Sequence, residues 1–330
     1  MANINGGSFQ GLDQGKGSTS TDKLGMFLKV FSGEVLTAFQ RRSVTMDKIV
    51  VRTITSGKSA TFPVLGRATA HYLLPSESLD DKREAMKATE KVINIDGLLT
   101  ADALIFDIES AMNHYDVRAE YANQLGESLA IANDASVLAE IAKLANSDEN
   151  IAGLGAPTVL EVGTAADLAE PKTLGEKVIE FLMKARGSLT QNYVLTGDRY
   201  AYVLPETYSA ILAALGPNAA NYSALGDLEK GVLTNVAGFT IVEVPHFTTG
   251  GADGKHAFPT SGKVTASNVV ALIAHRSAVG EVKLKDMSLE RARRPEYQAD
   301  QIIAKMAVGV GGLRPEATAA LVFTAASTGE

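Results

Sequence analysis

One long helix is the feature that most constrains how this sequence can fold. Asp116 is a plausible N-cap, and from there apolar residues recur every three or four positions up to about Ala145. The stripe consists of Val117, Tyr121, Leu125, Leu129, Ala132, Leu138, Ile141 and Leu144. A helix of about 30 residues is roughly 45 Å long, well beyond the usual globular helix. The pattern therefore predicts one long helix that could brace a broad and thin subunit.

The composition allows a large core and excludes several classes of function. The chain has 330 residues, of which 45% are hydrophobic, so more than one lobe is expected. Its formal net charge of −7 is opposite to the basic excess of proteins that grip nucleic acid. The absence of cysteine excludes disulfides, thiolate metal sites and a cysteine nucleophile. Without a signal peptide or a long apolar run, we expect synthesis in a cytoplasm and no membrane span.

The first 45 residues combine a flexible terminus with a short apolar helix. Residues 1–20 are rich in Gly, Ser, Asn and Gln and can bury little surface. A helical apolar stripe follows, which includes Phe27, Phe31 and Phe39. Two interpretations stay open: the stripe docks on another molecule, or it is an ordinary helix packed on its own chain.

The middle of the chain predicts mixed helix and sheet. Residues 44–65 resemble a β-hairpin around the turn residues 56–59, and residues 76–91 are a highly charged, projecting loop or solvated helix. A short helix is expected within 101–114, and 146–171 is a boundary rich in Gly, Ala and Pro. The strands and helices that alternate after this boundary predict an α/β lobe. Two strands around Gly311 and Gly312 are expected near the end of the chain.

Motifs for chemistry are weak throughout the sequence. Gly57-Lys58-Ser59 imitates the end of a phosphate-binding loop, but the glycine five residues earlier is replaced by Arg52, and a strand is expected to follow. Gly309-Val310-Gly311 lacks the third glycine of a dinucleotide site and is better explained as a turn between strands. The five histidines show no metal-ligand spacing. We therefore predict a protein that is not an enzyme, with no catalytic residue, cofactor site or metal site.

A basic cluster near the C-terminus has two explanations. Arg291, Arg293 and Arg294 lie beside two glutamates, as in a solvated face. The alternative is a set of charge-assisted contacts to a neighbouring chain, because the arginine fork suits bidentate pairing with carboxylates.

Four long stretches of this sequence carry a specific resemblance. They are FLKVFSGEVLTAF (27–39), SGKSATFPVLGRATAHYL (56–73), the segment 79–130 that begins LDDKREAMKATEKVINIDG, and RARRPEYQADQIIAKMAVGVGGLRPEA (291–317). Together they resemble the major capsid proteins of short-tailed (podovirus, autographivirus-type) bacteriophages. The resemblance spans nearly the whole chain and is far more specific than any short motif.

The resemblance implies an α+β fold shared by tailed-phage capsids, encapsulins and the herpesvirus capsid floor. Its parts map onto this sequence in chain order. They are an N-terminal arm (1–45), a first part of the P-domain (46–159) with an E-loop (66–92) and a spine helix (116–145), an A-domain (160–285), and P-domain return strands (286–330).

The resemblance also implies a function. We expect a major capsid protein that self-assembles, as pentamers and hexamers, into an icosahedral head in the host cytoplasm. The expected shell encloses double-stranded DNA without sequence-specific binding, and the expected partners are a scaffolding protein and a portal. The alternative is an encapsulin-like compartment with a cargo enzyme.

The expected contacts between subunits come from the arm and the E-loop. The arm would contribute Phe27, Phe31 and Phe39. The E-loop would place its acids over the arginine strand of a neighbour, where they fix the register of the two subunits. The candidate charged residues are Glu77, Asp80, Asp81, Glu84, Arg291, Arg293 and Arg294.

Overall fold

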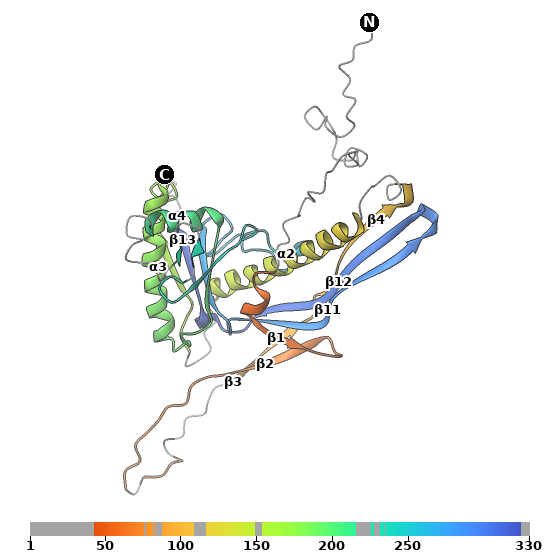
Figure 1. The fold of residues 1–330 in the computed structure, drawn as a ribbon. Helices are drawn as coiled ribbons and strands as arrows, with labels where there is room; N and C mark the ends of the chain where they lie inside the picture. The colour runs from red at the N-terminus through yellow and green to blue at the C-terminus, as the bar shows by residue number, and fades with distance from the viewer. Residues whose placement is uncertain are drawn as a thin grey trace. The chain divides into compact units, whose positions relative to one another are not determined.

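The elements of the chain come from a computed structural model (Figure 1). The structure describes residues 43–75, 77–80, 82, 88–108, 117–148, 154–215, 226–227, 232–233 and 235–324. The helices are α2 (Val117–Asn146), α3 (Pro171–Gln191) and α4 (Pro205–Leu215), with short 3-10 turns η2 (Met46–Lys48), η4 (Ala252–Gly254), η5 (Pro295–Tyr297) and η6 (Pro315–Ala317). The strands are β1 (Val50–Thr53), β2 (Ser59–Leu65), β3 (Ala88–Asn94), β4 (Gly97–Phe106), β5 (Thr158–Val162), β6 (Arg199–Val203), β7 (Gly226–Asp227), β8 (Val232–Leu233), β9 (Thr240–Glu243), β10 (Val269–His275), β11 (Val279–Arg294), β12 (Ala299–Gly312) and β13 (Thr318–Phe323).

The described chain divides into two compact units. The smaller unit contains Leu98–Ala130 and Asp286–Met306. The larger contains Ser43–Gly97, Ile131–Lys285 and the chain from Ala307 onward. The predicted spine helix is confirmed as α2, whose bounds lie within one residue of 116–145.

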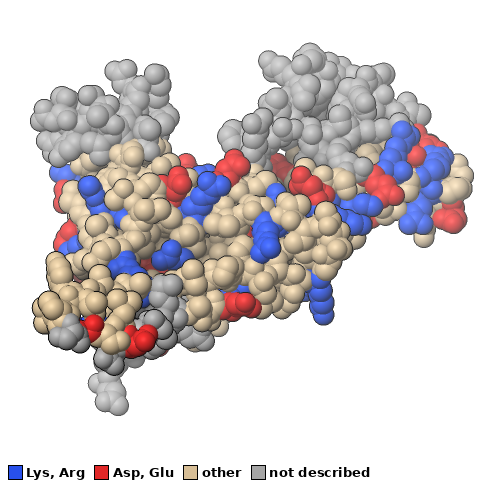
Figure 2. Space-filling model, turned by 90° about the horizontal axis from the view of Figure 1, so that it is seen from below, with Lys and Arg blue, Asp and Glu red and all other residues tan. Residues whose placement is uncertain are grey.

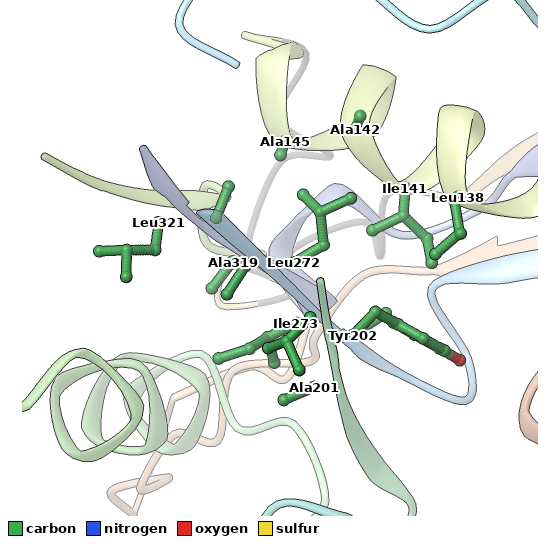
Figure 3. Close-up of a cluster of buried hydrophobic side chains, with 14 of the residues drawn as sticks. Leu138, Ile141, Ala142, Ala145, Ala201, Tyr202, Leu272, Ile273, Ala319 and Leu321 are labelled. Atoms are coloured by element: carbon green, nitrogen blue, oxygen red, sulfur yellow. The ribbon is translucent and has the colours of Figure 1, made fainter. Parts of the chain in front are cut away.

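The core of the larger unit is a five-stranded sheet covered on both faces. Its strand order is β5-β13-β10-β6-β9, and all seven residues of the central strand β10 are buried, as its unbroken apolar sequence predicts. Helices α3 and α4 pack against each other beside this sheet (Figure 1). The residues of α2 that belong to this unit lie on the opposite face (Figure 3). The sheet is therefore the middle layer of a three-layer lobe.

Helical spacing explains which face of α2 enters this core. Leu138, Ile141 and Ala145 recur at intervals of three and four and are almost fully buried. Figure 3 shows them directed toward the sheet that carries Leu272. Burial of a side chain such as Leu138 stabilises the fold by about 1.5–3 kcal/mol, so this face joins the helix firmly to the lobe.

Strands β2 and β3 form an antiparallel ribbon that pairs Ser59 with Asn94 at one end and Leu65 with Ala88 at the other. The predicted E-loop (66–92) therefore includes the first part of strand β3. Pro63 lies in this two-stranded ribbon, where an edge position tolerates its missing N–H.

Glycines of β12 allow the ribbon to cross it closely. A Cβ atom at Gly309 would overlap the carbonyl oxygen of Asn94, and one at Gly311 would press on Ile93. The Gly309-Val310-Gly311 segment is therefore part of a strand, and the predicted turn there is wrong. Gly309 is required because the backbone of Asn94 passes directly over it, and Gly311 leaves room for the side chain of Ile93.

The predicted hairpin over 44–65 is wrong in its pairing. Both strands exist, but β1 pairs in parallel with β11, and β2 pairs with β3. Gly57, at φ +109°, makes the expected turn between them. A turn signal shows where the chain bends, whereas the partner of each strand depends on residues far away in the sequence.

Two further local expectations are corrected. Residues 101–106 form the end of strand β4 rather than the start of a helix. Residues 107–108 are helical, and the rest of the predicted helix, 109–114, lies outside the described residues. The boundary segment 146–171 contains strand β5, which pairs in parallel with β13. Strand β13 thus belongs to the same sheet as β6, β9 and β10 of the predicted A-domain. The predicted domain bounds themselves stay a prediction.

The smaller unit is formed around the turn between β11 and β12. Pro295–Tyr297 make this turn, and Gln298 closes it in a left-handed conformation at φ +46°. The backbone N–H of Asp107, just after β4, donates to the carbonyl of Gln298. This hydrogen bond ties the end of β4 to the β11–β12 turn.

Candidate functional site

The β2–β3 ribbon and its loop carry an unusual amount of exposed apolar surface. Tyr72 is 95% exposed, although a tyrosine of a packed monomer normally buries most of its ring. Among the described residues of this segment, the other large exposed apolar side chains are Leu65, Leu73, Leu74, Leu79 and Val92. Apolar side chains gathered on one protruding segment are typical of a surface that a partner covers.

Two charged residues of the loop, Glu77 and Lys82, pair with each other. Glu77 also accepts a hydrogen bond from the Leu74 N–H at 3.0 Å. Hydrogen bonds from Lys82 and from that N–H lower the pKa of Glu77. Asp80 donates its N–H to the Ser78 hydroxyl at 3.2 Å. The other two predicted acids, Asp81 and Glu84, lie outside the described residues, as do Phe27, Phe31 and Phe39 of the predicted arm.

The first residues of this loop contact the body of the larger unit. The guanidinium of Arg67 lies 3.4 Å from the ring centroid of Tyr193, just after α3. A guanidinium over an aromatic ring is a favourable electrostatic contact. Tyr193 is 73% exposed and near Met183 and Leu195, two other exposed apolar side chains. This contact is one point that holds the loop near α3.

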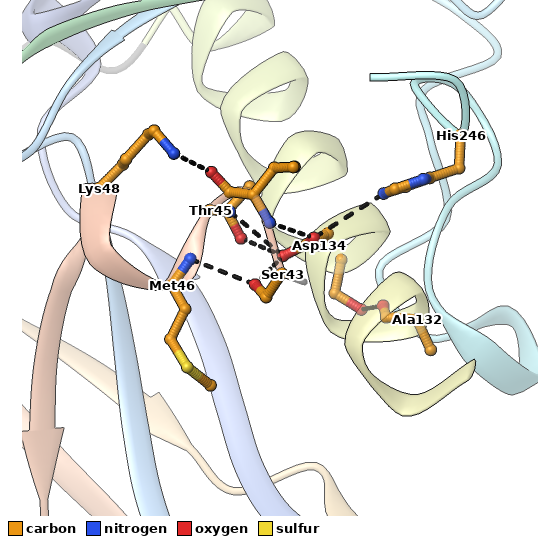
Figure 4. A network of polar contacts seen from close by, with 9 residues as sticks. Ser43, Thr45, Met46, Lys48, Ala132, Asp134 and His246 are labelled. Carbon is orange, nitrogen blue, oxygen red and sulfur yellow. Dashed lines mark hydrogen bonds and ion pairs between the residues drawn. The ribbon is translucent and has the colours of Figure 1, made fainter. Parts of the chain in front are cut away.

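A buried carboxylate anchors the chain where the predicted arm ends. Asp134 of α2 is 1% exposed and accepts hydrogen bonds from the Ser43 hydroxyl at 2.5 Å, the Val44 N–H at 2.7 Å and the Thr45 hydroxyl at 2.5 Å (Figure 4). The Thr45 N–H adds a longer contact of 3.4 Å. Several donors on one buried carboxylate offset the cost of removing its charge from water. Residues 43–45 are thus fixed to the spine helix.

Two basic side chains complete the surroundings of Asp134. His246 Nε2 lies 3.9 Å from the carboxylate, and Lys48 Nζ donates to the Val44 carbonyl at 2.5 Å (Figure 4). Burial lowers the pKa of Lys48, although Asp134 and Asp47 act in the opposite direction. The anchor is therefore a polar cluster within a largely apolar lobe.

The predicted arginine cluster lies on the β11–β12 strands of the smaller unit. Arg293 binds Asp107 with both terminal nitrogens, at 2.5 and 2.6 Å, and this pairing raises the pKa of the Arg293 guanidinium. Arg291 binds Asp300 at 2.6 Å, while Arg294 binds the neutral amide oxygen of Gln301 at 2.8 Å. Figure 2 shows basic and acidic side chains lying close together on the face of the molecule that it presents. Two of the three arginines thus have carboxylate partners within their own chain.

Sequence reasoning missed Asp134, although a signal was present. Asp134 stands four residues before Leu138 and seven before Ile141, on the same face of the helix. A lone acid on an apolar face indicates a buried, partnered carboxylate, because an unpartnered one would be too costly. The identity of its partners was not visible, because they lie about 90 residues away in the sequence.

Features for other kinds of function are few in the part of the chain that the structure describes. No group of three or more His, Cys, Asp or Glu residues there could hold a metal ion. Within the same residues, no helix is long and apolar enough to cross a membrane. Strand β2 begins at Ser59, so Gly57-Lys58-Ser59 is followed by a strand, as predicted, and not by the helix of a phosphate-binding loop.

Comparison with known proteins gives a consistent result over nearly the whole chain. Residues 61–322 match the Gp10A-like family of major capsid proteins. The major capsid protein of Enterobacteria phage T3 is 62% identical over 98% of this chain and 99% of its own length. That of Escherichia phage T7 is 60% identical over the same shares. Both are phage proteins, which does not favour the encapsulin-like alternative.

A solved structure supports the same conclusion. The capsid structure of the cyanophage P-SCSP1u has a TM-score of 0.75 and 32% identity, covering 91% of this chain and 94% of that one. The predicted tailed-phage capsid fold is therefore confirmed, and the ribbon, the spine helix and the three-layer lobe are its parts. This chain belongs to the Gp10A-like family of major capsid proteins.

Proposed function

We propose that copies of this chain assemble, as pentamers and hexamers, into an icosahedral head that encloses double-stranded DNA. The observation that carries the proposal is the alignment with two phage major capsid proteins over 98% of the chain. Rings of identical subunits require heterologous contacts, in which one surface of a copy meets a different surface of the next.

The ribbon and its loop supply one such surface. Their exposed apolar side chains, Tyr72 above all, gain little from their own body and would be covered by a neighbouring copy. Each contact is modest, but every subunit makes several of them, so the closed shell is far more stable than any single contact.

The charge of the chain fits a container better than a DNA-binding protein. A net charge of −7 disfavours tight, salt-dependent attachment to phosphates. The enclosed DNA would be retained by the closed wall, without reading of its sequence. A scaffolding protein that sets the curvature, a portal at one vertex and assembly in the host cytoplasm complete the proposal.

The test is assembly of the purified full chain, alone and with the scaffolding protein of the same phage. Negative-stain microscopy should show rings, tubes or shells, and sedimentation should show large particles whose amount rises with protein concentration. A chain that sediments only as a monomer at every salt and protein concentration, with and without scaffold, contradicts the proposal.

A further inference from the structure

The loop between β9 and β10 is fastened along the last turns of α2. A Cβ atom at Gly251 would overlap the Ser136 hydroxyl, so loop and helix are in close contact. Further along, the side chain of Asn146 exchanges two hydrogen bonds of 2.7 Å with the backbone of Val264. The loop is thus held at both ends on one side of the helix.

His256, in the middle of this loop, bridges two carboxylates. Its Nδ1 lies 2.7 Å from Glu140 of α2, and its Nε2 lies 2.8 Å from Asp96. An ionised carboxylate only accepts hydrogen bonds, so the ring satisfies both partners only when both nitrogens carry a proton. The geometry is therefore that of a charged imidazolium between two acids.

Asp96 gives this bridge its significance, because it lies where the ribbon joins the body. It lies two residues after the end of β3, and its N–H donates to the Val308 carbonyl of β12 at 3.2 Å. The next residue, Gly97, turns the chain at φ +138°. The same stretch of β12 carries Gly309, over which the ribbon crosses closely. His256 thus connects the spine helix to the root of the ribbon.

The backbone conformation of His256 indicates that surrounding contacts hold this residue in place. Its φ is +49°, in the left-handed region that a residue with a Cβ adopts only at a cost. Such a conformation persists where surrounding contacts hold it. Here the Gly251 N–H donates to the His256 carbonyl at 3.2 Å, and the two carboxylates hold the ring.

We propose that His256 is a positioning residue of the capsid subunit, which in its charged form fixes the β2–β3 ribbon relative to the spine helix and releases it when it becomes neutral. Neutral imidazole has one N–H and can serve only one of the two acids. The ribbon root then keeps its crossing over Gly309 but loses its tie to Glu140.

The charged groups around the ring set the pH at which release occurs. They are Asp96 at the ribbon root, Glu140 and Lys143 on α2, and Lys255 in the loop, which donates to the Asp96 carbonyl. Hydrogen bonds from the ring to Asp96 and Glu140 raise the pKa of His256 to about 9, against the effect of burial. Because this pKa is above the usual value of about 6.5, the stabilisation is complete below about pH 6.5 and is lost as the pH rises through about 9.

The ribbon position can be measured within one chain, because the protein has no cysteine. Spin labels on Leu65→Cys and Met183→Cys, both at exposed positions, report the distance between the ribbon and α3. Labelled chains diluted with unlabelled ones exclude distances between copies. We expect a narrow distance distribution at neutral pH that broadens at about pH 10, above the pKa of His256. His256→Gln should be broad at both pH values.

The matched control is His71→Gln, which removes an exposed histidine of the ribbon loop and should behave as wild type. An NMR titration of the unmodified chain measures the pKa of His256 directly. The two variants, His256→Gln and His71→Gln, serve only to assign the histidine resonances. We expect His256 to titrate near 9, and Asp96→Asn to lower that value.

Three results overturn the proposal. They are a His256 midpoint near about 6.5, an unchanged wild-type distribution after His256 has lost its proton, and a narrow distribution in His256→Gln at neutral pH. If His256→Gln fails to fold, the test rests on whether the wild-type distance distribution differs between the two pH values. The importance of the ribbon angle for shells rests on the proposed function. Failure of assembly would appear in microscopy, and failure of the bridge would appear in these intrachain measurements.

Discussion

At the scale of single residues, Asp134 is the side chain that holds residues 43–45 against helix α2. Asp134→Asn keeps the size but replaces one acceptor oxygen with an amide donor, facing the hydroxyls and N–H groups of residues 43–45. We expect a loss of about 3 kcal/mol in the free energy of unfolding, measured by urea denaturation, because buried hydrogen bonds to a charge are lost. The control is Asp167→Asn, an exposed carboxylate bound to Thr164, which should change stability by less than about 0.5 kcal/mol. Equal effects of both variants would contradict the anchor.

The arginine cluster allows a second residue-level prediction, about contacts between subunits. Arg293→Glu would face Asp107 and Asp300 with a third negative charge, so it should lower the melting temperature of the chain itself. Among the described residues, Arg294→Glu loses a hydrogen bond to the neutral Gln301 rather than an ion pair, so it should leave the melting temperature nearly unchanged. If Arg294 pairs with E-loop acids of a neighbour, this variant should lower the yield of shells at least about tenfold, since each shell repeats the contact many times.

The matched rescue for Arg294→Glu is reversal of an E-loop acid, Asp80→Lys or Glu84→Lys, scored by particle counts in negative stain. Recovery of shells by either reversal supports the contact between subunits. Normal assembly of Arg294→Glu would show that this arginine makes no such contact, and failure of both reversals would assign its effect to another surface.

At the scale of elements, the crossing of the ribbon over β12 depends on the absence of a side chain. In Gly309→Ala the new methyl group would overlap the Asn94 carbonyl, so we expect a loss of about 3 kcal/mol in unfolding free energy. Gly187→Ala in α3 is the matched control, because a Cβ there meets nothing within 4 Å. That variant should gain up to about 1 kcal/mol through the better helix propensity of alanine. Denaturant titration compares the two, and a stable Gly309→Ala would contradict the close crossing.

At the scale of the whole molecule, two truncations separate assembly from folding. Removal of residues 1–42 leaves every described hydrogen bond of Asp134 in place, whereas removal of residues 1–45 also deletes its donors. We expect the shorter deletion to keep its far-UV circular dichroism and melting temperature but to assemble poorly. The longer deletion should also melt at lower temperature. Unfolding after the shorter deletion would instead show that the arm's apolar stripe belongs to the core of its own chain.

Elements whose periodicity is local were predictable, and elements defined by distant partners were not. The apolar spacing of α2 and the unbroken apolar run of β10 led directly to the helix and the buried strand. The last residues of strand β4 were mistaken for the start of a helix, and β5 was mistaken for a boundary segment. Their assignment depends on β12 and β13, which lie about 150–200 residues later in the sequence.

The sequence by itself determined the family, the spine helix and the absence of obvious catalytic motifs, because long similar stretches and helical periodicity are carried by the order of the residues. Only the tertiary structure decided the partners of β1 and β2 and the roles of Asp134 and His256. Each role needs groups at least 89 residues apart in the chain to lie within hydrogen-bond distance. Such contacts form when packing of the core closes long loops, and no local pattern records which loops will close.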